Sequence, residues 1–174
     1  MFITKRIGAN SKDIRKIKKL YMESFPENER FSFGMMIKNE SGNYETFGFY
    51  QDDKFIGFAI MLNSLDISHI IYFATLPEIR GKGLGAKALG AISRIKKGLR
   101  VIVDIEREVP DCPENEIRRR RKNFYLRNGF SETEVRYRWQ DEAYEILVSG
   151  GSLSKEDFGA FWKNLGIKKN TADD

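Results

Sequence analysis

A glycine-rich segment carries the clearest chemistry in the chain. It reads Arg80, Gly81, Lys82, Gly83, Leu84, Gly85 and Ala86, and it stands between an expected strand and an expected helix. The first N–H groups of a helix have no partner inside the helix, and the helix dipole favours negative charge at the same end. Glycine permits positive φ and lets a ligand approach the backbone closely. The segment therefore predicts a site for an anionic group such as phosphate.

Other residue types exclude several kinds of site. Cys112 is the single cysteine and His69 the single histidine, so we expect no disulfide and no metal. A basic run from Arg118 to Arg121 continues into Lys122, within a net charge of +5. Such a run can attract phosphate or nucleic acid, but a solvated helix face is the simpler interpretation, and we expect no nucleic-acid partner. No signal peptide and no membrane-length apolar run is present, which favours a cytoplasmic protein without a membrane partner.

Strands and a first helix are expected ahead of the glycine segment. Ile14, Ile17, Leu20 and Tyr21 recur at helical spacing and predict a helix from about residue 11 to 25, capped by Asn10 and Ser11. A short strand is expected before it, over residues 2–7. The runs YETFGFY, KFIGFAIML and DISHIIYFAT predict three more strands, which form an antiparallel meander.

Behind the segment, Leu84, Ala88 and Ile92 belong to an apolar stripe that predicts the most regular helix of the chain. The strand LRVIVDIE follows, and a helix between two strands makes them a parallel pair. A helix starting at Asp111, two strands and a C-terminal helix at about 155–165 complete a mixed α+β fold. We expect a single domain over residues 1–174, with a central mixed sheet of six to seven strands and a frayed tail at 167–174.

Phosphate-binding segments of several kinds can be compared with this one. A Walker loop is excluded, because no stretch supplies Gly, four residues and then Gly-Lys-Ser/Thr. Gly83, Gly85 and Ala88 satisfy a dinucleotide fingerprint, and Asp104 lies about 20 residues further on, where an acid would bind ribose. The antiparallel meander and the residues around Pro77 are foreign to that fingerprint, which turns directly off its strand.

The stretch FATLPEIRGKGLGAKAL resembles the coenzyme A signature of the GNAT acetyltransferase superfamily, with Arg80, Gly83 and Gly85 at the pattern positions. A second motif agrees, since Tyr125, Gly129 and Phe130 match the superfamily's Tyr-x-x-x-Gly-Phe. The order of expected elements is also similar over nearly the whole chain. The resemblance implies the GNAT fold and an N-acetyltransferase that moves an acetyl group from acetyl-coenzyme A to an amine.

The resemblance also implies a site. Coenzyme A would lie where the strand that ends in Phe73, Ala74 and Thr75 splays from the parallel strand LRVIVDIE. The backbone of residues 81–86 would hold the pyrophosphate, with Arg80 and Lys82 as charge partners. The hydroxyl of Tyr125 would stand beside the sulfur and protonate the departing thiolate.

A general base is required as well, because a lysine-like amine has a pKa of about 10.4 and is protonated at neutral pH. Glu106, at the end of its strand, and Glu29, in the phenylalanine-rich loop FPENERFSF, are the candidates. Two other functions stay open: a non-catalytic acyl-coenzyme A-binding module of the same fold, and a dinucleotide-binding protein. The sequence leaves the acceptor amine open, and we expect a monomer or a homodimer.

Overall fold

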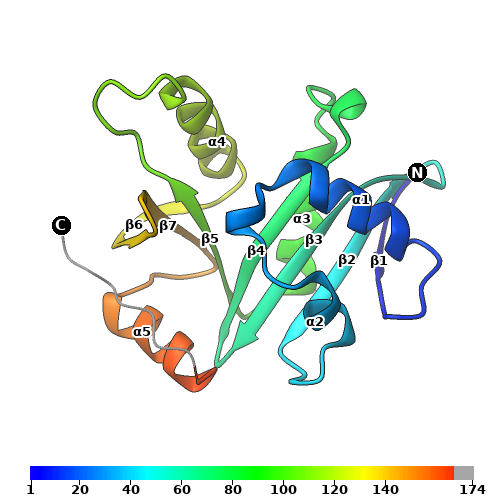
Figure 1. Cartoon of the computed structure of the whole chain (residues 1–174), viewed down its shortest axis with the longest axis horizontal. Coiled ribbons are helices and arrows are strands. Elements are labelled where there is room, and N and C mark those ends of the chain that lie inside the picture. Colours follow the sequence, from blue (N-terminus) through cyan, green and yellow to red (C-terminus); the bar gives the residue numbers. More distant parts are fainter. Residues whose placement is uncertain (167–174) are drawn as a thin grey trace. The chain divides into compact units, whose positions relative to one another are not determined.

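The computed structural model describes residues 1–166, over which the chain forms seven strands and five α-helices (Figure 1). They are β1 (Phe2–Arg6), α1 (Ile14–Ser24), α2 (Phe33–Lys38), β2 (Tyr44–Gln51), β3 (Lys54–Ser64), β4 (Ile67–Thr75), α3 (Leu84–Ile95), β5 (Arg100–Glu106), α4 (Asn115–Arg127), β6 (Ser131–Trp139), β7 (Glu142–Ser149) and α5 (Lys155–Asn164). Two short 3₁₀ helices, η1 (Glu27–Glu29) and η2 (Pro77–Ile79), lie in the connections. The tail predicted for 167–174 lies outside the described residues.

The strands form a seven-stranded mixed sheet in the order β1-β2-β3-β4-β5-β7-β6, in which β4 and β5 are parallel. The predicted α+β architecture is therefore confirmed. The chain divides into two compact units, and the division falls within β4. The first unit comprises Met1–Asn63 and Ile70–Ile92, and the second comprises Ser64–His69 and the chain from Ser93 onward. The single domain expected from the sequence stays a prediction.

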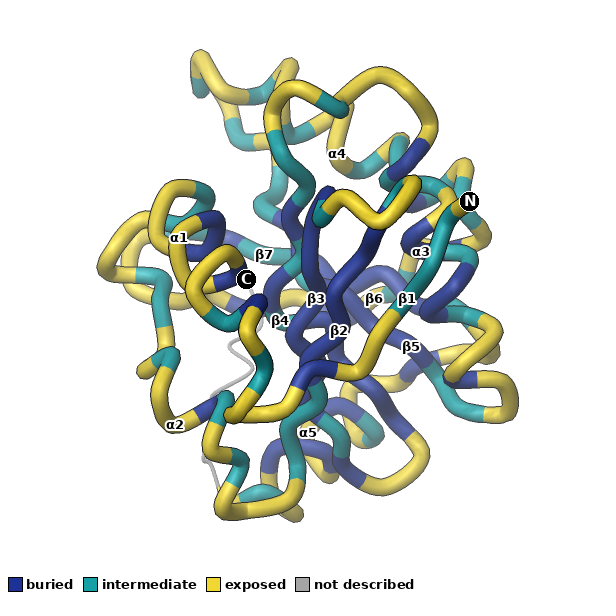
Figure 2. Tube along the Cα trace, turned by 90° about the vertical axis from the view of Figure 1, so that its right-hand side faces the viewer, coloured by how far each residue is buried: buried dark blue, intermediate teal, exposed yellow. Residues whose placement is uncertain are grey.

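The first unit is built on the predicted antiparallel meander. β2 pairs with both β1 and β3, and the residues of β2 and β3 are buried along most of their length (Figure 2). The hairpin turns at Asp52 and Asp53, whose φ angles are 49° and 61°. Positive φ at both positions is what a type I′ turn requires, and this turn matches the twist of the two strands. The acidic pair thus fixes the register of the hairpin.

Helix α1 begins at Ile14, later than the sequence predicts, and packs Ile17, Leu20 and Tyr21 into the core of the first unit. The Ser11 hydroxyl accepts a hydrogen bond from the Asp13 N–H (3.3 Å) in a turn ahead of the helix, so it does not act as the expected helix cap. The Asp13 carboxylate accepts from Lys16 (2.9 Å) and Tyr50 (2.8 Å), and these bonds lower its pKa. Asp13 therefore binds a strand side chain instead of capping its own helix.

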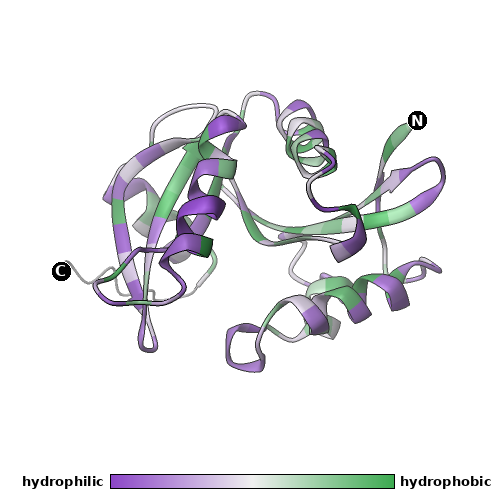
Figure 3. Ribbon diagram, turned by 90° about the horizontal axis from the view of Figure 1, so that it is seen from above, coloured by the Kyte–Doolittle hydropathy of each residue, from purple (hydrophilic) through white to green (hydrophobic). Residues whose placement is uncertain are grey.

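The second unit contains β5, β7 and β6, with β7 between the other two and antiparallel to both. Helix α4 is mainly hydrophilic (Figure 3). Tyr125 is its buried residue. It begins at Asn115, so the helix start predicted at Asp111 is wrong. Asp111 has a left-handed φ of 56°, and the Asn115 side chain bonds both the N–H and the C=O of Val109 (3.1 and 2.6 Å). These contacts form a turn that delays the helix.

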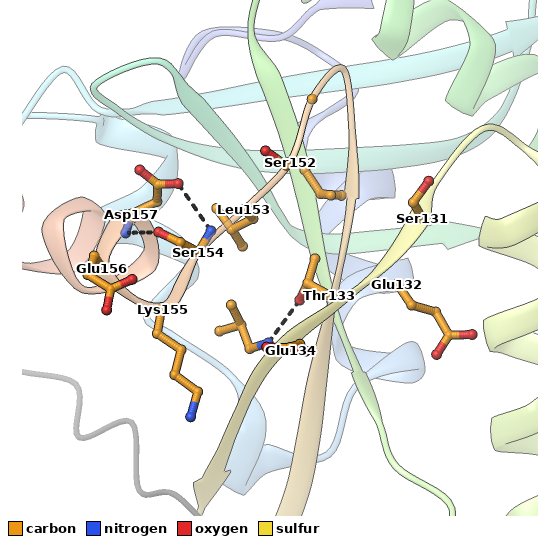
Figure 4. A pocket seen from close by; sticks show the side chains of 13 residues that line it. Ser131, Glu132, Thr133, Glu134, Ser152, Leu153, Ser154, Lys155, Glu156 and Asp157 are labelled. Carbon is orange, nitrogen blue, oxygen red and sulfur yellow. Dashed lines mark hydrogen bonds between the residues drawn. The ribbon is translucent and has the colours of Figure 1, made fainter.

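Helix α5 starts where the sequence predicts it. The Ser154 hydroxyl accepts from the Asp157 N–H, and the Asp157 carboxylate accepts from the Ser154 N–H, both at 3.1 Å (Figure 4). Arg100 connects this helix start to the turn between β3 and β4, because its guanidinium donates two hydrogen bonds to Asp66 (2.8 Å each) and one to Asp157 (2.7 Å). No helix within residues 1–166 is long and apolar enough to cross a membrane.

Candidate functional site

The glycine-rich segment links η2 to α3 in the first unit, and residues 81–83 are exposed. Gly81 and Gly83 have φ angles of 76° and 73°, a region in which L side chains are strained. The Gly83 carbonyl accepts the first hydrogen bond of α3, from the Lys87 N–H (3.2 Å). The N–H groups of residues 84–86 find no acceptor in the described part of the chain. An exposed loop thus presents unpaired donors at the positive end of a helix, as an anion site requires.

The end of β4 leads into this loop. Phe73 contacts Phe49 edge-on, with ring centroids 6.0 Å apart, and Ala74 is buried. A side chain at Gly57 would come within 2.5 Å of the Ala74 carbonyl oxygen, so glycine is required there for β3 to approach β4. Arg80 folds back through a long hydrogen bond to the Thr75 carbonyl (3.4 Å), whereas Lys82 is exposed. The residues predicted to bind coenzyme A, from Phe73 to Ala86, therefore all lie in the first unit.

Tyr125 lies near the end of α4 in the second unit, where the chain turns sharply. Gly129 has a φ of 87°, and this turn lets the N–H groups of Asn128 and Phe130 donate to the Tyr125 carbonyl (2.9 and 3.2 Å). The Phe130 ring then packs against the Tyr125 ring at 5.3 Å between centroids. The spacing Tyr-x-x-x-Gly-Phe is thus a helix end in which glycine supplies the left-handed residue and phenylalanine holds the tyrosine ring.

The electrostatic surroundings of Tyr125 keep its phenol in the protonated form. Its ring is buried, and its hydroxyl has no hydrogen-bond partner among residues 1–166. Burial raises the pKa of the phenol, Arg121 opposes the rise, and the carboxylates of Asp104 and Glu106 add to it. The phenol is therefore protonated at neutral pH. Glu106 itself is ion-paired with Arg121, so the first base candidate shares its charge with a guanidinium.

Glu29 lies in the first unit, in the loop between α1 and α2. Two tyrosine hydroxyls fix this loop: Tyr72 donates to the Glu29 carbonyl (2.8 Å) and accepts from the Phe31 N–H (2.9 Å), and Tyr21 donates to the Phe31 carbonyl (2.9 Å). Phe31 is partly exposed on the same loop. The loop is thus a fixed surface that carries two carboxylates, Glu27 and Glu29, and the partly exposed ring of Phe31.

The arginine run is engaged in ion pairs. Arg118 donates to both carboxylate oxygens of Glu142 at 2.9 Å, and this pair is largely buried. The other pairs are Arg119–Glu108, Arg120–Glu116, Arg121–Glu106, Lys122–Glu132 and Lys122–Glu145. Arg120–Glu116 lies within α4, whereas the other pairs attach this polar helix to its unit, which supports the helix-face interpretation. Cys112 donates to the Glu114 carboxylate (3.1 Å) ahead of the helix.

A polar network that the sequence does not predict lies inside the second unit. The Asp104 carboxylate is bonded by His69 Nε2 (2.8 Å) on one oxygen and by the Tyr137 hydroxyl on the other. The three residues come from β4, β5 and β6, so no local motif relates them. A lone histidine and an aspartate inside an otherwise apolar strand were the only signals available in the sequence.

The second unit also has an open hollow of about 720 Å³, lined by the beginning of β6, the end of β7 and the first turn of α5 (Figure 4). None of the residues predicted to form the site lines it. Its polar groups largely satisfy one another: Thr133 accepts from the Val135 N–H (3.1 Å), and Ser154 and Asp157 form the capping box. We therefore assign it no ligand.

Comparisons with protein families and with solved structures both give matches. The family model described as acetyltransferase (GNAT) domain matches residues 42–132. No curated protein sequence matches the chain. A Bacteroides thetaiotaomicron structure described as a GNAT-family acetyltransferase is 24% identical, with a TM-score of 0.76 over 90% of this chain and 91% of that chain. The ribosomal-protein-S18-alanine N-acetyltransferase from Escherichia coli is 19% identical, with a TM-score of 0.61 over 90% and 98%. The PaiA N-acetyltransferase from Thermoplasma acidophilum, in complex with coenzyme A, is 16% identical, with a TM-score of 0.59 over 86% and 98%.

Proposed function

Because the chain belongs to the GNAT acetyltransferase family, whose domain model matches more than half of its residues, we propose that it transfers an acetyl group from acetyl-coenzyme A to an amine. The observation that carries the proposal is the exposed glycine loop, with Gly81 and Gly83 in the left-handed region and unpaired N–H groups at the start of α3. A pyrophosphate fits such a loop, because it accepts several hydrogen bonds at once and its charge complements the helix dipole.

The residues of the loop have separate roles in this proposal. The backbone of residues 81–86 binds the pyrophosphate, and Arg80 and Lys82 add positive charge, each such contact contributing about 0.3–2 kcal/mol. Phe73, Ala74 and Thr75 offer strand backbone to the amide arm of coenzyme A. When bound, acetyl-coenzyme A supplies the thioester whose carbonyl carbon the amine attacks.

Proton transfers complete the reaction. The Tyr125 hydroxyl, which has no other hydrogen-bond partner in the described chain, donates a proton to the departing thiolate. The amine must also lose a proton before it attacks. Glu106 and Glu29 are the candidates for the base that takes this proton, and Glu106 forms an ion pair with Arg121. Glu29 lies on the loop that the Tyr21 and Tyr72 hydroxyls fix.

Calorimetry with acetyl-coenzyme A tests the binding part of the proposal. We expect one molecule bound per chain and no binding of NAD, which serves as the control for the dinucleotide alternative. Release of free thiol in the presence of amines tests the catalytic part. Spermidine, kanamycin and a peptide that begins with alanine form the acceptor panel, the last chosen because the Escherichia coli neighbour acts on such an amine. Binding without thiol release for any acceptor would favour the non-catalytic module.

A further inference from the structure

Arg30 stands in the loop between α1 and α2, and hydrogen bonds fix its backbone on both sides. Its N–H donates to the Glu27 carbonyl (3.2 Å). The Tyr72 hydroxyl holds the two neighbouring residues, because it donates to the Glu29 carbonyl (2.8 Å) and accepts from the Phe31 N–H (2.9 Å). The loop therefore presents the Arg30 side chain from a defined position.

The Arg30 side chain is half-buried, yet no carboxylate within residues 1–166 forms an ion pair with it. Its Nη1 donates to the Met22 sulfur (2.7 Å), and a thioether is a weak acceptor. Its Nε is buried and has no hydrogen-bond partner in the described chain. The side chain thus carries a positive charge for which the described chain supplies no counter-charge.

Other half-buried arginines show what such a side chain binds when its partner belongs to the chain. Arg100 donates to two aspartates, and Arg118 donates to both carboxylate oxygens of Glu142. A guanidinium that is removed from water without an anionic partner costs free energy, so buried charges are normally paired. Arg30 differs from Arg100 and Arg118 in this respect, which indicates an anion that comes from outside the chain.

The aromatic surroundings of Arg30 strengthen its attraction for an anion. Burial raises the pKa of the Tyr21 phenol and the Arg30 charge opposes the rise, so the guanidinium lies close to this tyrosine. The Tyr21 ring packs edge-on against Tyr72 at 4.8 Å between centroids, and Phe31 contacts the same Tyr72 ring at 6.1 Å. Charges attract each other more strongly where aromatic groups replace water, because the effective dielectric constant is lower there.

The other charges of the loop favour one kind of anion. Glu27 and Glu29 precede Arg30 closely in the chain, and their carboxylates repel a group with two negative charges more than a group with one. A phosphate monoester carries close to two negative charges at neutral pH, whereas a carboxylate carries one. The planar guanidinium also matches the planar carboxylate in geometry. A carboxylate is therefore the anion that suits this loop.

The same loop is joined to the strand that is proposed to bind coenzyme A. Tyr72 of β4 holds it, and the next residues of that strand, Phe73 to Thr75, offer their backbone to coenzyme A in the proposed function. Glu29, a candidate for the base, directly precedes Arg30. Arg30 is thus fixed to the strand that the proposed cosubstrate uses.

We propose that Arg30 binds a carboxylate of the acceptor, so the acceptor is an amine that also carries a carboxylate, such as an amino acid or a short peptide. The inference rests on the proposed acetyl transfer and names its class of acceptor. Arg30 donates hydrogen bonds to the carboxylate and takes no part in the proton transfers. It therefore contributes to the affinity for the acceptor, and KM is the quantity that it controls.

The test uses pairs of acceptors that differ in one carboxylate, with thiol release as the assay. The pairs are lysine and cadaverine, phenylalanine and 2-phenylethylamine, and the dipeptide alanyl-phenylalanine and its C-terminal amide. In at least one pair, the wild type should use the member with the carboxylate at a kcat/KM about tenfold or more above that of its partner.

Arg30→Met removes the charge and keeps an unbranched side chain. For the preferred acceptor, it should raise KM by about 10- to 100-fold with kcat little changed, because a charge-assisted hydrogen bond is lost. For the partner without the carboxylate, kcat/KM should stay within about twofold. The variant should melt no lower than the wild type, because it loses no ion pair of the described chain.

Arg15→Met is the matched control, since it removes the same charge from an exposed position of α1. It should leave the ratio of kcat/KM within each pair unchanged. If Arg30→Met melts below the assay temperature, Arg30→Gln replaces it, because glutamine also lacks the charge and keeps a polar side chain at the position.

The outcomes separate the two proposals. A wild-type protein that releases no thiol with any acceptor overturns the acetyl-transfer proposal, and this inference with it. An active wild type that prefers the carboxylate member in none of the pairs overturns this inference alone. A preference that survives unchanged in the Arg30 variant, or a rise in KM that is equal for both members of a pair, also refutes it.

Discussion

Removal of one oxygen atom, in Tyr125→Phe, tests the proposed proton donor with little structural cost. The Tyr125 ring keeps its contacts with Phe124 and Phe130, at 5.4 and 5.3 Å between ring centroids. The lost hydroxyl has no hydrogen-bond partner in the described chain, so no buried partner is left unsatisfied. We therefore expect the free energy of unfolding to change by less than about 0.5 kcal/mol.

The effect on catalysis follows from the surroundings of the phenol. General acid catalysis contributes typically about 10² to 10⁴ in rate. Burial raises the pKa of Tyr125, which makes the phenol a weaker acid than an exposed tyrosine, and water can partly replace it. These two effects place the expected loss of kcat at about 10- to 100-fold, or about 1.4–2.7 kcal/mol in the activation barrier.

The assay is thiol release at saturating acetyl-coenzyme A, with the affinity for acetyl-coenzyme A measured separately. Tyr44→Phe is the control, since it removes a hydroxyl from a half-buried tyrosine of β2 that has no role in the proposed chemistry. Undiminished kcat in Tyr125→Phe would show that the reaction needs no phenol, and would return Tyr125 to a packing role.

Three further predictions concern binding and stability. Gly83→Val should weaken acetyl-coenzyme A binding by about tenfold or more in a folded protein, because valine is strained at a φ of 73° and its side chain obstructs the loop. Unchanged affinity in calorimetry would place the ligand elsewhere. Arg118→Ala should destabilise the protein by about 2 kcal/mol and Arg120→Ala by less than about 0.5 kcal/mol. The reason is that the Arg118 side chain is 11% exposed in its ion pair, whereas the Arg120 side chain is 76% exposed. Equal shifts in the urea midpoint of the two variants would contradict this. Arg100→Gln should lower the melting temperature most near neutral pH. Arg100 lowers the pKa of Asp66 and of Asp157 in the folded protein. Its contribution to stability is therefore present above the unfolded aspartate pKa of about 3.9 and is lost as the pH falls through the lower pKa values of the folded state. A difference in melting temperature that stays constant from pH 7 to pH 2 would refute this coupling.

Patterns of neighbouring residues predicted the helices and strands well, and the predictions that failed have physical causes. The hairpin at Asp52 and Asp53 and the capping box at Ser154 are set by neighbours in the sequence, so their patterns could be recognised. The starts of α1 at Ile14 and of α4 at Asn115 depend on hydrogen bonds that capping rules do not consider. Asp13 binds Tyr50 from β2, and the Asn115 side chain folds back on Val109. Capping propensity alone cannot rank these competing hydrogen bonds.

The candidate site residues also differ in whether a pattern of neighbouring residues could reveal them. The glycine loop is contiguous, so residue types and spacing suffice to predict a backbone site between a strand and a helix. The network of Asp104, His69 and Tyr137 joins three strands and has no spacing to recognise. The sequence could suggest Glu106 as a base, but its ion pair with Arg121 depends on a contact between β5 and α4.

The division of the chain within β4 has a consequence for synthesis on the ribosome. Residues 64–69 belong to the second unit, yet they are translated between the two segments of the first. When Ile92 has emerged, Asp66 lacks Arg100, His69 lacks Asp104, and the Ser64 hydroxyl lacks the Phe161 carbonyl, its acceptor at 3.0 Å. The first unit must therefore begin to fold around a turn whose partners have not yet emerged from the ribosome, since domains fold from the N-terminus as they emerge. Neither unit corresponds to a contiguous fragment that could be expressed alone.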